Sequence, residues 1–149
     1  MSLLRWLYRD GRPSRLASVV NRGTAALYAL GLLPNYLVAM EVVGRRSGRA
    51  FRLPMVMAVV DGQRDLVSML GENVDWVRNV RAAGGRAVLR HGRREEVRLE
   101  EVPVEMRAPM LKAYLRRAPG ARPHVPVHKD APLSEFERIA AQIPVFRVT

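Results

Sequence analysis

The chain of 149 residues contains no cysteine, only two lysines and only three histidines. The absence of cysteine excludes disulfides, thiolate metal sites and a cysteine nucleophile. His91, His124 and His128 lack the further ligands that a zinc pattern needs, so we expect no metal site. No uncharged apolar run reaches the roughly 18 residues of a membrane-spanning helix. The first residues also lack the features of a signal peptide, so the sequence predicts a cytoplasmic protein.

Acidic residues are scarce, because 14 of them face 25 basic residues and leave a net charge of +11. The first 52 residues hold nine arginines but only two acidic residues, Asp10 and Glu41. This basic charge predicts a polyanionic partner, which is a nucleic acid, an anionic membrane surface or a phosphorylated cofactor. Aromatic residues make up only 6% of the chain and few of them lie in the basic stretches. Base stacking therefore has little to work with, and we expect no nucleic-acid partner.

Residues 1–35 are predicted to form an N-terminal amphipathic helical segment. Apolar residues recur at helical spacing within Ser14–Leu33, and Ser2–Tyr8 also reads as helix. Arginines decorate both stretches, which leaves two interpretations open. The apolar face packs against the protein's own core, which is the favoured reading, or residues 1–33 lie on the inner face of an anionic membrane as a peripheral contact.

Residues 36–149 are predicted to form a second domain that is mainly β with peripheral helices, in the α+β class. Strands outnumber helices and tight turns join them, so a doubly wound parallel sheet is disfavoured. A small, partly closed antiparallel barrel fits better. The expected strands are Tyr36–Val43, Phe51–Val60, Asp65–Leu70, Arg86–His91, Arg94–Val102 and Pro144–Thr149, and the expected helices are Trp76–Ala83 (with Asp75 as N-cap), Val104–Arg117 and Ser134–Gln142 (with Ser134 and Glu137 as a capping box), with a loop over Ala118–Pro132.

The turn Gly44–Arg49 has the sequence Gly-Arg-Arg-Ser-Gly-Arg and lies between two predicted strands. Its glycines permit a tight turn that exposes backbone N–H groups. Its three guanidinium groups suit phosphate or carboxylate. The turn is therefore either a site for an anion or a solvated basic hairpin turn, and the motif alone does not decide.

A second cluster runs from Asp75 to Arg81. Trp76 and Asn79 are three residues apart and share one face of the predicted helix. Trp76 could pack beside a flat ring, and the Asn79 amide could bond a phosphate at the helix N-terminus. The alternative is a core tryptophan beside a surface amide. The chain has no G-x-S-x-G elbow and no glycine-rich nucleotide loop, and we assign no catalytic residue.

Together, Val43–Arg49, Pro54 and Asp75–Ala82 at this separation resemble the deazaflavin-dependent nitroreductase family. The closing Pro144–Arg147 is similar to the end of many members, so the resemblance covers about residues 36–149. It implies a split β-barrel, related to the FMN-binding barrel of pyridoxamine phosphate oxidases. It also implies coenzyme F420, a deazaflavin whose phospholactyl tail is extended by glutamates. Members transfer a hydride from this cofactor to a quinone, a nitroaromatic compound or another small apolar acceptor.

The resemblance also implies a set of cofactor-binding residues. The turn would hold the phosphate and the acidic tail, two neighbouring strands would line the ring, and the helix would close the phosphate side. Tyr114 is the candidate for a tyrosine near the acceptor. The implied residues are Arg45, Arg46, Ser47, Gly48 and Arg49 for the tail, Pro54, Met55, Ser68, Met69 and Leu70 for the ring, and Trp76 and Asn79 for the phosphate side.

Three alternatives stay open. FMN in the same barrel is less favoured, because FMN ends in a single phosphate whereas the turn carries three arginines. A non-catalytic basic protein that binds nucleic acid or membrane would also explain the charge. Related barrels often dimerise, so a homodimer is a further expectation.

Overall fold

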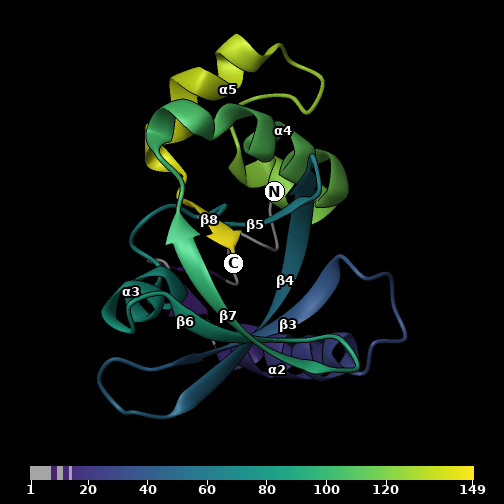
Figure 1. Ribbon diagram of the computed structural model, residues 1–149, viewed down its shortest axis with the longest axis vertical. Helices are drawn as coiled ribbons and strands as arrows, with labels where there is room; N and C mark the ends of the chain where they lie inside the picture. Colours follow the sequence, from purple (N-terminus) through teal and green to yellow (C-terminus); the bar gives the residue numbers. More distant parts are fainter. Residues whose placement is uncertain (1–7, 10–11, 14) are drawn as a thin grey trace.

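The computed structural model describes residues 8, 9, 12, 13 and 15–149. Figure 1 shows six antiparallel strands that close into one barrel, with helices around it. The expected antiparallel barrel is confirmed, and it is closed rather than partly closed. Around the barrel the order is β3 (Leu37–Val43), β4 (Ala50–Val60), β5 (Gln63–Val67), β8 (Val145–Val148), β7 (Arg94–Glu101) and β6 (Arg86–Arg90), which pairs again with β3.

The interior of the barrel holds one hydrophobic cluster, which we call the barrel core. Alternate residues of each strand point inward, as strand geometry requires. Helix α3 (Asp75–Ala82) closes one end of the barrel and contributes Val77 and Val80. Other members of the barrel core are Met40, Val42, Met55, Met57, Leu66, Leu89, Leu99, Phe146 and Val148.

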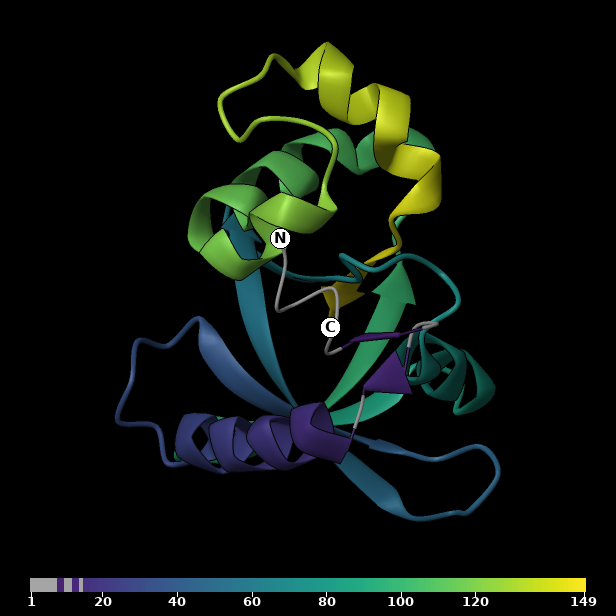
Figure 2. The same ribbon diagram turned by 180° about the vertical axis from the view of Figure 1, so that it is seen from behind.

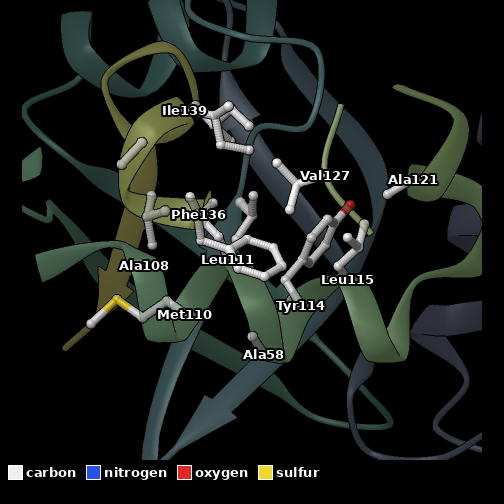
Figure 3. Packing of buried hydrophobic residues seen from close by; sticks show 14 of the residues in the cluster. Ala58, Ala108, Met110, Leu111, Tyr114, Leu115, Ala121, Val127, Phe136 and Ile139 are labelled. Atoms are coloured by element: carbon white, nitrogen blue, oxygen red, sulfur yellow. The ribbon is translucent and has the colours of Figure 1, made fainter. Parts of the chain in front are cut away.

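A second hydrophobic cluster, the cap core, lies over the outer face of β4, β5 and β8. It includes Ala58, Val67 and Val145 from those strands. Figure 3 shows Leu111 and Tyr114 of one helix packed against Phe136 of another. The covering elements are η1 (Val104–Met106), α4 (Ala108–Arg117), η2 (Pro119–His124), α5 (Leu133–Ile139) and η3 (Ala140–Gln142).

Helix α2 (Arg15–Ala29) packs against β3 and β4, below the barrel in Figure 2. Its end is fixed by a close approach of two glycines. The Gly92 N–H donates to the Ala29 carbonyl at 2.8 Å, and a Cβ added at Gly31 would lie 2.6 Å from the Gly92 nitrogen. Within the described part of the chain, every helix is too short or too polar to cross a bilayer. The predicted peripheral membrane contact of residues 1–33 stays a prediction.

The N-terminal segment differs from the expected pair of helices. Tyr8–Arg9 (β1) pairs with Arg12–Pro13 (β2) as a short antiparallel ribbon, so Tyr8 is not helical. The rest of Ser2–Tyr8 and the proposed cap Ser14 lie outside the described residues. Helix α2 ends at Ala29 rather than Leu33, because Gly31 takes φ +76° and breaks the helical path.

Three further corrections fall between residues 104 and 134, a region rich in proline. The helix predicted over Val104–Arg117 is divided into η1 and α4, because Pro109 is tolerated in the first turn of a helix but not in its interior. The loop predicted over Ala118–Pro132 contains the short 3-10 helix η2. Pro132, rather than Ser134, caps α5, and no capping-box hydrogen bond forms.

Asp75 and the end of β5 also lie differently from the expectation. Asp75 is the first residue of α3, and Val74 takes the N-cap position without a side-chain hydrogen bond. Strand β5 ends at Val67, so residues 68–70 belong to the following turn rather than to the strand. This turn leads directly to α3.

Candidate functional site

The turn at residues 44–49 is held by its own backbone. The Gly44 N–H donates to the Arg49 carbonyl at 2.7 Å, and the Gly48 N–H donates to the Gly44 carbonyl at 2.9 Å. Gly48 has φ +71°, which favours glycine. A Cβ added at Gly44 would lie 2.5 Å from Cε2 of Phe51, so this position also needs glycine or a displaced ring. Both positions of the motif therefore favour glycine, Gly48 for its backbone conformation and Gly44 for lack of space.

Arg45 joins this turn to α3. Its backbone N–H and its Nη1 both donate to Oδ1 of Asn79, at 3.1 and 2.8 Å. Its Nη2 lies 3.5 Å from Oδ1 of Asp75, one helical turn before Asn79. Asn79 is only 6% exposed, so this contact is sheltered from water. Thus two motifs that are 34 residues apart in sequence form one structural unit.

The other donors of the turn face outward. Arg46 and Arg49 are exposed, and their guanidinium groups have no partner among the described residues. The backbone N–H groups of Arg46 and Ser47 also lack an acceptor there. Ser47 Oγ accepts the Arg49 N–H at 3.2 Å and keeps its own proton to donate. Adjacent free N–H groups flanked by two guanidinium groups form a donor set that fits a phosphate or a row of carboxylates.

Two of the predicted ring residues, Met55 and Leu70, and Trp76 of the predicted phosphate side share one hydrophobic cluster. Met55 belongs to the barrel core, and Leu70 and Trp76 pack half-buried against the same cluster. The Trp76 ring lies 5.6 Å from the Phe146 ring with an interplanar angle of 57°. The half-buried indole and leucine provide an apolar wall at the end of the barrel that carries α3.

The remaining predicted residues lie elsewhere. Pro54 points to the opposite face of β4 from Met55, because neighbouring strand residues alternate. Met69 packs against the cap core, on the far side from Leu70. Ser68 is buried, and its hydroxyl donates to the Gly71 carbonyl at 2.6 Å, which stabilises the turn before α3. Tyr114 is buried in the cap core, where desolvation raises the pKa of its hydroxyl.

The loop that leads into α3 is fixed by charged contacts that the sequence did not reveal. Nη2 of Arg81 lies 3.1 Å from Glu72 of the loop and 2.7 Å from Glu101 of β7. Glu101 also accepts from Arg107 at 3.3 Å. Arg107 is buried and donates to three backbone carbonyls of the cap, those of Val102, Ala140 and Ile143. The loop, α3, the barrel and the cap are therefore linked by one charged network.

Comparison with known proteins identifies the family. A profile described as F420H(2)-dependent quinone reductase matches residues 15–126. The chain belongs to this family. Its cofactor is coenzyme F420, and the match includes α2, the arginine turn and α3. No curated protein matches the sequence.

Solved structures share the fold. An F420-H2-dependent reductase is 19% identical to this chain, and the alignment covers 76% of this chain and 94% of the reductase with a TM-score of 0.51. A structure described as a domain-swapped dimer is also 19% identical. Its alignment covers 88% of this chain and 91% of that chain, with a TM-score of 0.56. A candidate pyridoxamine 5′-phosphate oxidase from Listeria innocua is 7% identical. Its alignment covers 76% of this chain and 82% of that chain, with a TM-score of 0.50. These likenesses confirm the split β-barrel.

Proposed function

We propose that this F420-dependent reductase delivers a hydride from reduced coenzyme F420 to a quinone, or to a small apolar acceptor of similar shape such as a nitroaromatic compound. The arginine turn is the tail site of the cofactor. The observation that carries the proposal is the contact of Arg45 with Asn79 and Asp75. This contact joins the turn that carries Arg46 and Arg49 to helix α3, whose second residue is Trp76.

The residues divide into those that hold the anion and those that position them. Arg46, Arg49 and the Ser47 hydroxyl bind the phosphate and the first carboxylates of the tail, aided by the free N–H groups of the turn. Arg45 and Asn79 are positioning residues, because their hydrogen bonds are made within the protein. Gly44 and Gly48 permit the backbone path that exposes those N–H groups.

The apolar side of the site accounts for the choice of acceptor. When bound, coenzyme F420 supplies a hydride, and a quinone then takes one further proton from solvent to become the quinol. Trp76 and Leu70 offer half-buried apolar surface against which flat rings pack. The family description favours a quinone over a nitroaromatic acceptor.

Fluorescence titration with coenzyme F420 and with FMN tests this assignment. The wild-type protein should bind the deazaflavin more tightly than FMN. Arg46→Ala and Arg49→Ala should each weaken deazaflavin binding by about 1–2 kcal/mol, roughly 5- to 30-fold, because each removes a charge-assisted contact. The reduced cofactor should then be consumed faster with a soluble quinone than with a nitroaromatic compound.

Arg116→Gln is the matched control, since Arg116 is an exposed arginine of α4 in the cap. It also lowers the net charge by one but should leave deazaflavin binding unchanged. Equal losses in the control and in the turn variants would mean that only overall charge matters. Unchanged affinity in both turn variants would show that the turn is not the tail site.

A further inference from the structure

A groove of about 540 Å³ is lined by residues of β3, β6 and β7 and by the first residue of β4. One end is lined by Val43 and Ala50, the two residues that flank the arginine turn. The other end is lined by Arg86 and Arg98. The groove therefore starts at the proposed tail site and leads away from it across the sheet.

Arg86 and Arg98 are directly opposite each other in the β6–β7 ladder. Both are exposed, and neither guanidinium has a partner among the described residues. Directly opposed like charges destabilise an antiparallel pair. Two unpaired arginines in register are therefore a cost that the fold itself does not explain.

The other charges of this face are already paired. Glu41 accepts from Arg52 at 2.8 Å and from Arg90 at 2.7 Å. Burial alone would raise the pKa of Glu41, but the hydrogen bonds from the two arginines lower it, so Glu41 is ionised. Glu96 accepts from Arg94 at 3.1 Å. Each carboxylate lining the groove thus has a guanidinium of its own, and the charges of Arg86 and Arg98 remain uncompensated.

The ladder between β3 and β6 ends before the arginine turn. Glu41 of β3 pairs with Val88 of β6, which pairs with Glu96 of β7. Glu41 with Val88 is the last pair that joins β3 to β6, whereas β3 stays paired with β4 as far as Val43 and Ala50. Val43, Arg86 and Arg98 lie beyond that last pair and line the same groove.

We propose that Arg86 and Arg98 form a second anion site, which binds the distal carboxylates of the oligoglutamyl tail of coenzyme F420. The tail leaves the arginine turn between Val43 and Ala50 and follows the groove over β6 to β7. This inference rests on the proposed function, because it requires the phosphate to sit in the turn. The ligand chemistry follows from charge: a chain of carboxylates is the complement of a row of unpaired guanidinium groups.

The test compares two forms of the cofactor, one ending at the phospholactyl group and one carrying several glutamates. Wild-type protein should bind the long form more tightly, and the gain should shrink as salt rises. Arg86→Gln and Arg98→Gln should each reduce affinity for the long form by roughly 3- to 10-fold and leave the short form unchanged. Arg116→Gln should change neither. In ligand-free protein at low salt, neither groove variant should lower the melting temperature, because each removes a repulsion.

The outcomes separate this inference from the proposed function. Equal affinity of wild-type protein for both forms, or groove variants that keep the full preference for the long form, would overturn the second anion site while leaving the turn assignment intact. An equal loss for both forms in the groove variants would also overturn it, because the arginines would then act on the fold. Failure of wild-type protein to bind either form would refute the proposed function itself.

Discussion

Arg45 does not point into solvent as an arginine of a basic turn would. It donates to Asn79 from both its backbone and its side chain, and it approaches Asp75. Its neighbours Arg46 and Arg49 are the exposed ones. At the scale of residues, the three arginines of the motif therefore differ, since one fixes the turn on α3 and two remain free for the proposed ligand.

A double-mutant cycle tests the contact between Arg45 and Asn79. Asn79→Ala leaves the Arg45 N–H and guanidinium without their acceptor, and should lower the free energy of unfolding by about 1–3 kcal/mol. In the Asn79→Ala protein, Arg45→Ala should lower the free energy of unfolding by less than it does in the wild type. The difference between the two losses is the coupling energy, which should be about 0.5–3 kcal/mol. Urea unfolding measures both. Asn73→Ala, which removes an exposed hydrogen bond from Arg78, is the control and should stay within about 0.5 kcal/mol. Additive losses would mean that the two residues do not interact.

Asp65 is a buried carboxylate in β5, and neither of its oxygens has a hydrogen-bond partner among the described residues. Its ion-pair partner in the described part of the chain is Arg147, whose Nε lies 3.8 Å from Oδ1 of Asp65. Burial raises the pKa of Asp65 from 3.8 to about 6, although the charge of Arg147 acts in the opposite direction. The folded state therefore holds this proton more tightly than the unfolded chain does.

The consequence is a loss of stability with rising pH. The stability that the protonated Asp65 adds to the free energy of unfolding is fully present below about pH 4 and is lost as the pH rises through about 6. The loss amounts to at most about 3 kcal/mol. Asp65→Asn should raise the free energy of unfolding at pH 7.5, roughly by this amount, and have little effect at pH 4. Urea titrations at the two pH values measure the difference between variant and wild type. The prediction fails if the difference is the same at both.

At the scale of elements, α2 is held to the barrel at its end. Gly31→Ala should lower the free energy of unfolding by about 2 kcal/mol, because it places a Cβ at φ +76° and 2.6 Å from the Gly92 nitrogen. Gly23 lies within α2, and a Cβ added there would have no neighbour within 4 Å. Gly23→Ala should therefore raise the free energy of unfolding by about 0.5–1 kcal/mol. Thermal unfolding of both variants distinguishes a specific clash from a general effect of alanine. A neutral Gly31→Ala would show that α2 is not fixed there.

Strand and helix positions were largely predictable, because alternation and turn residues are local signals. The errors have local causes as well. Pro109 divides a predicted helix, and Gly31 ends another early. Strand alternation could also have shown that Pro54 and Met55 point to opposite faces of β4. The sequence-based assignment of both to one side of a ring overlooked this rule.

At the scale of the whole molecule, closure of the barrel brings the site together. The turn after β3 lies on the same side of the barrel as helix α3 in Figure 1, and the contact of Arg45 with Asn79 joins the two. Contacts such as Arg45 with Asn79 join residues far apart in the chain and leave no periodic signal in it. The same holds for the opposed pair Arg86 and Arg98, which only the register of β6 and β7 reveals.

A crystal structure of the protein with coenzyme F420 is the most direct test of the central claim, that the arginine turn holds the acidic tail. We predict phosphate oxygens within about 3 Å of the Arg46 or Arg49 guanidinium or of the turn N–H groups. Arg45 should remain hydrogen-bonded to Asn79. A cofactor bound elsewhere, with Arg46 and Arg49 contacting no anion, would contradict the claim.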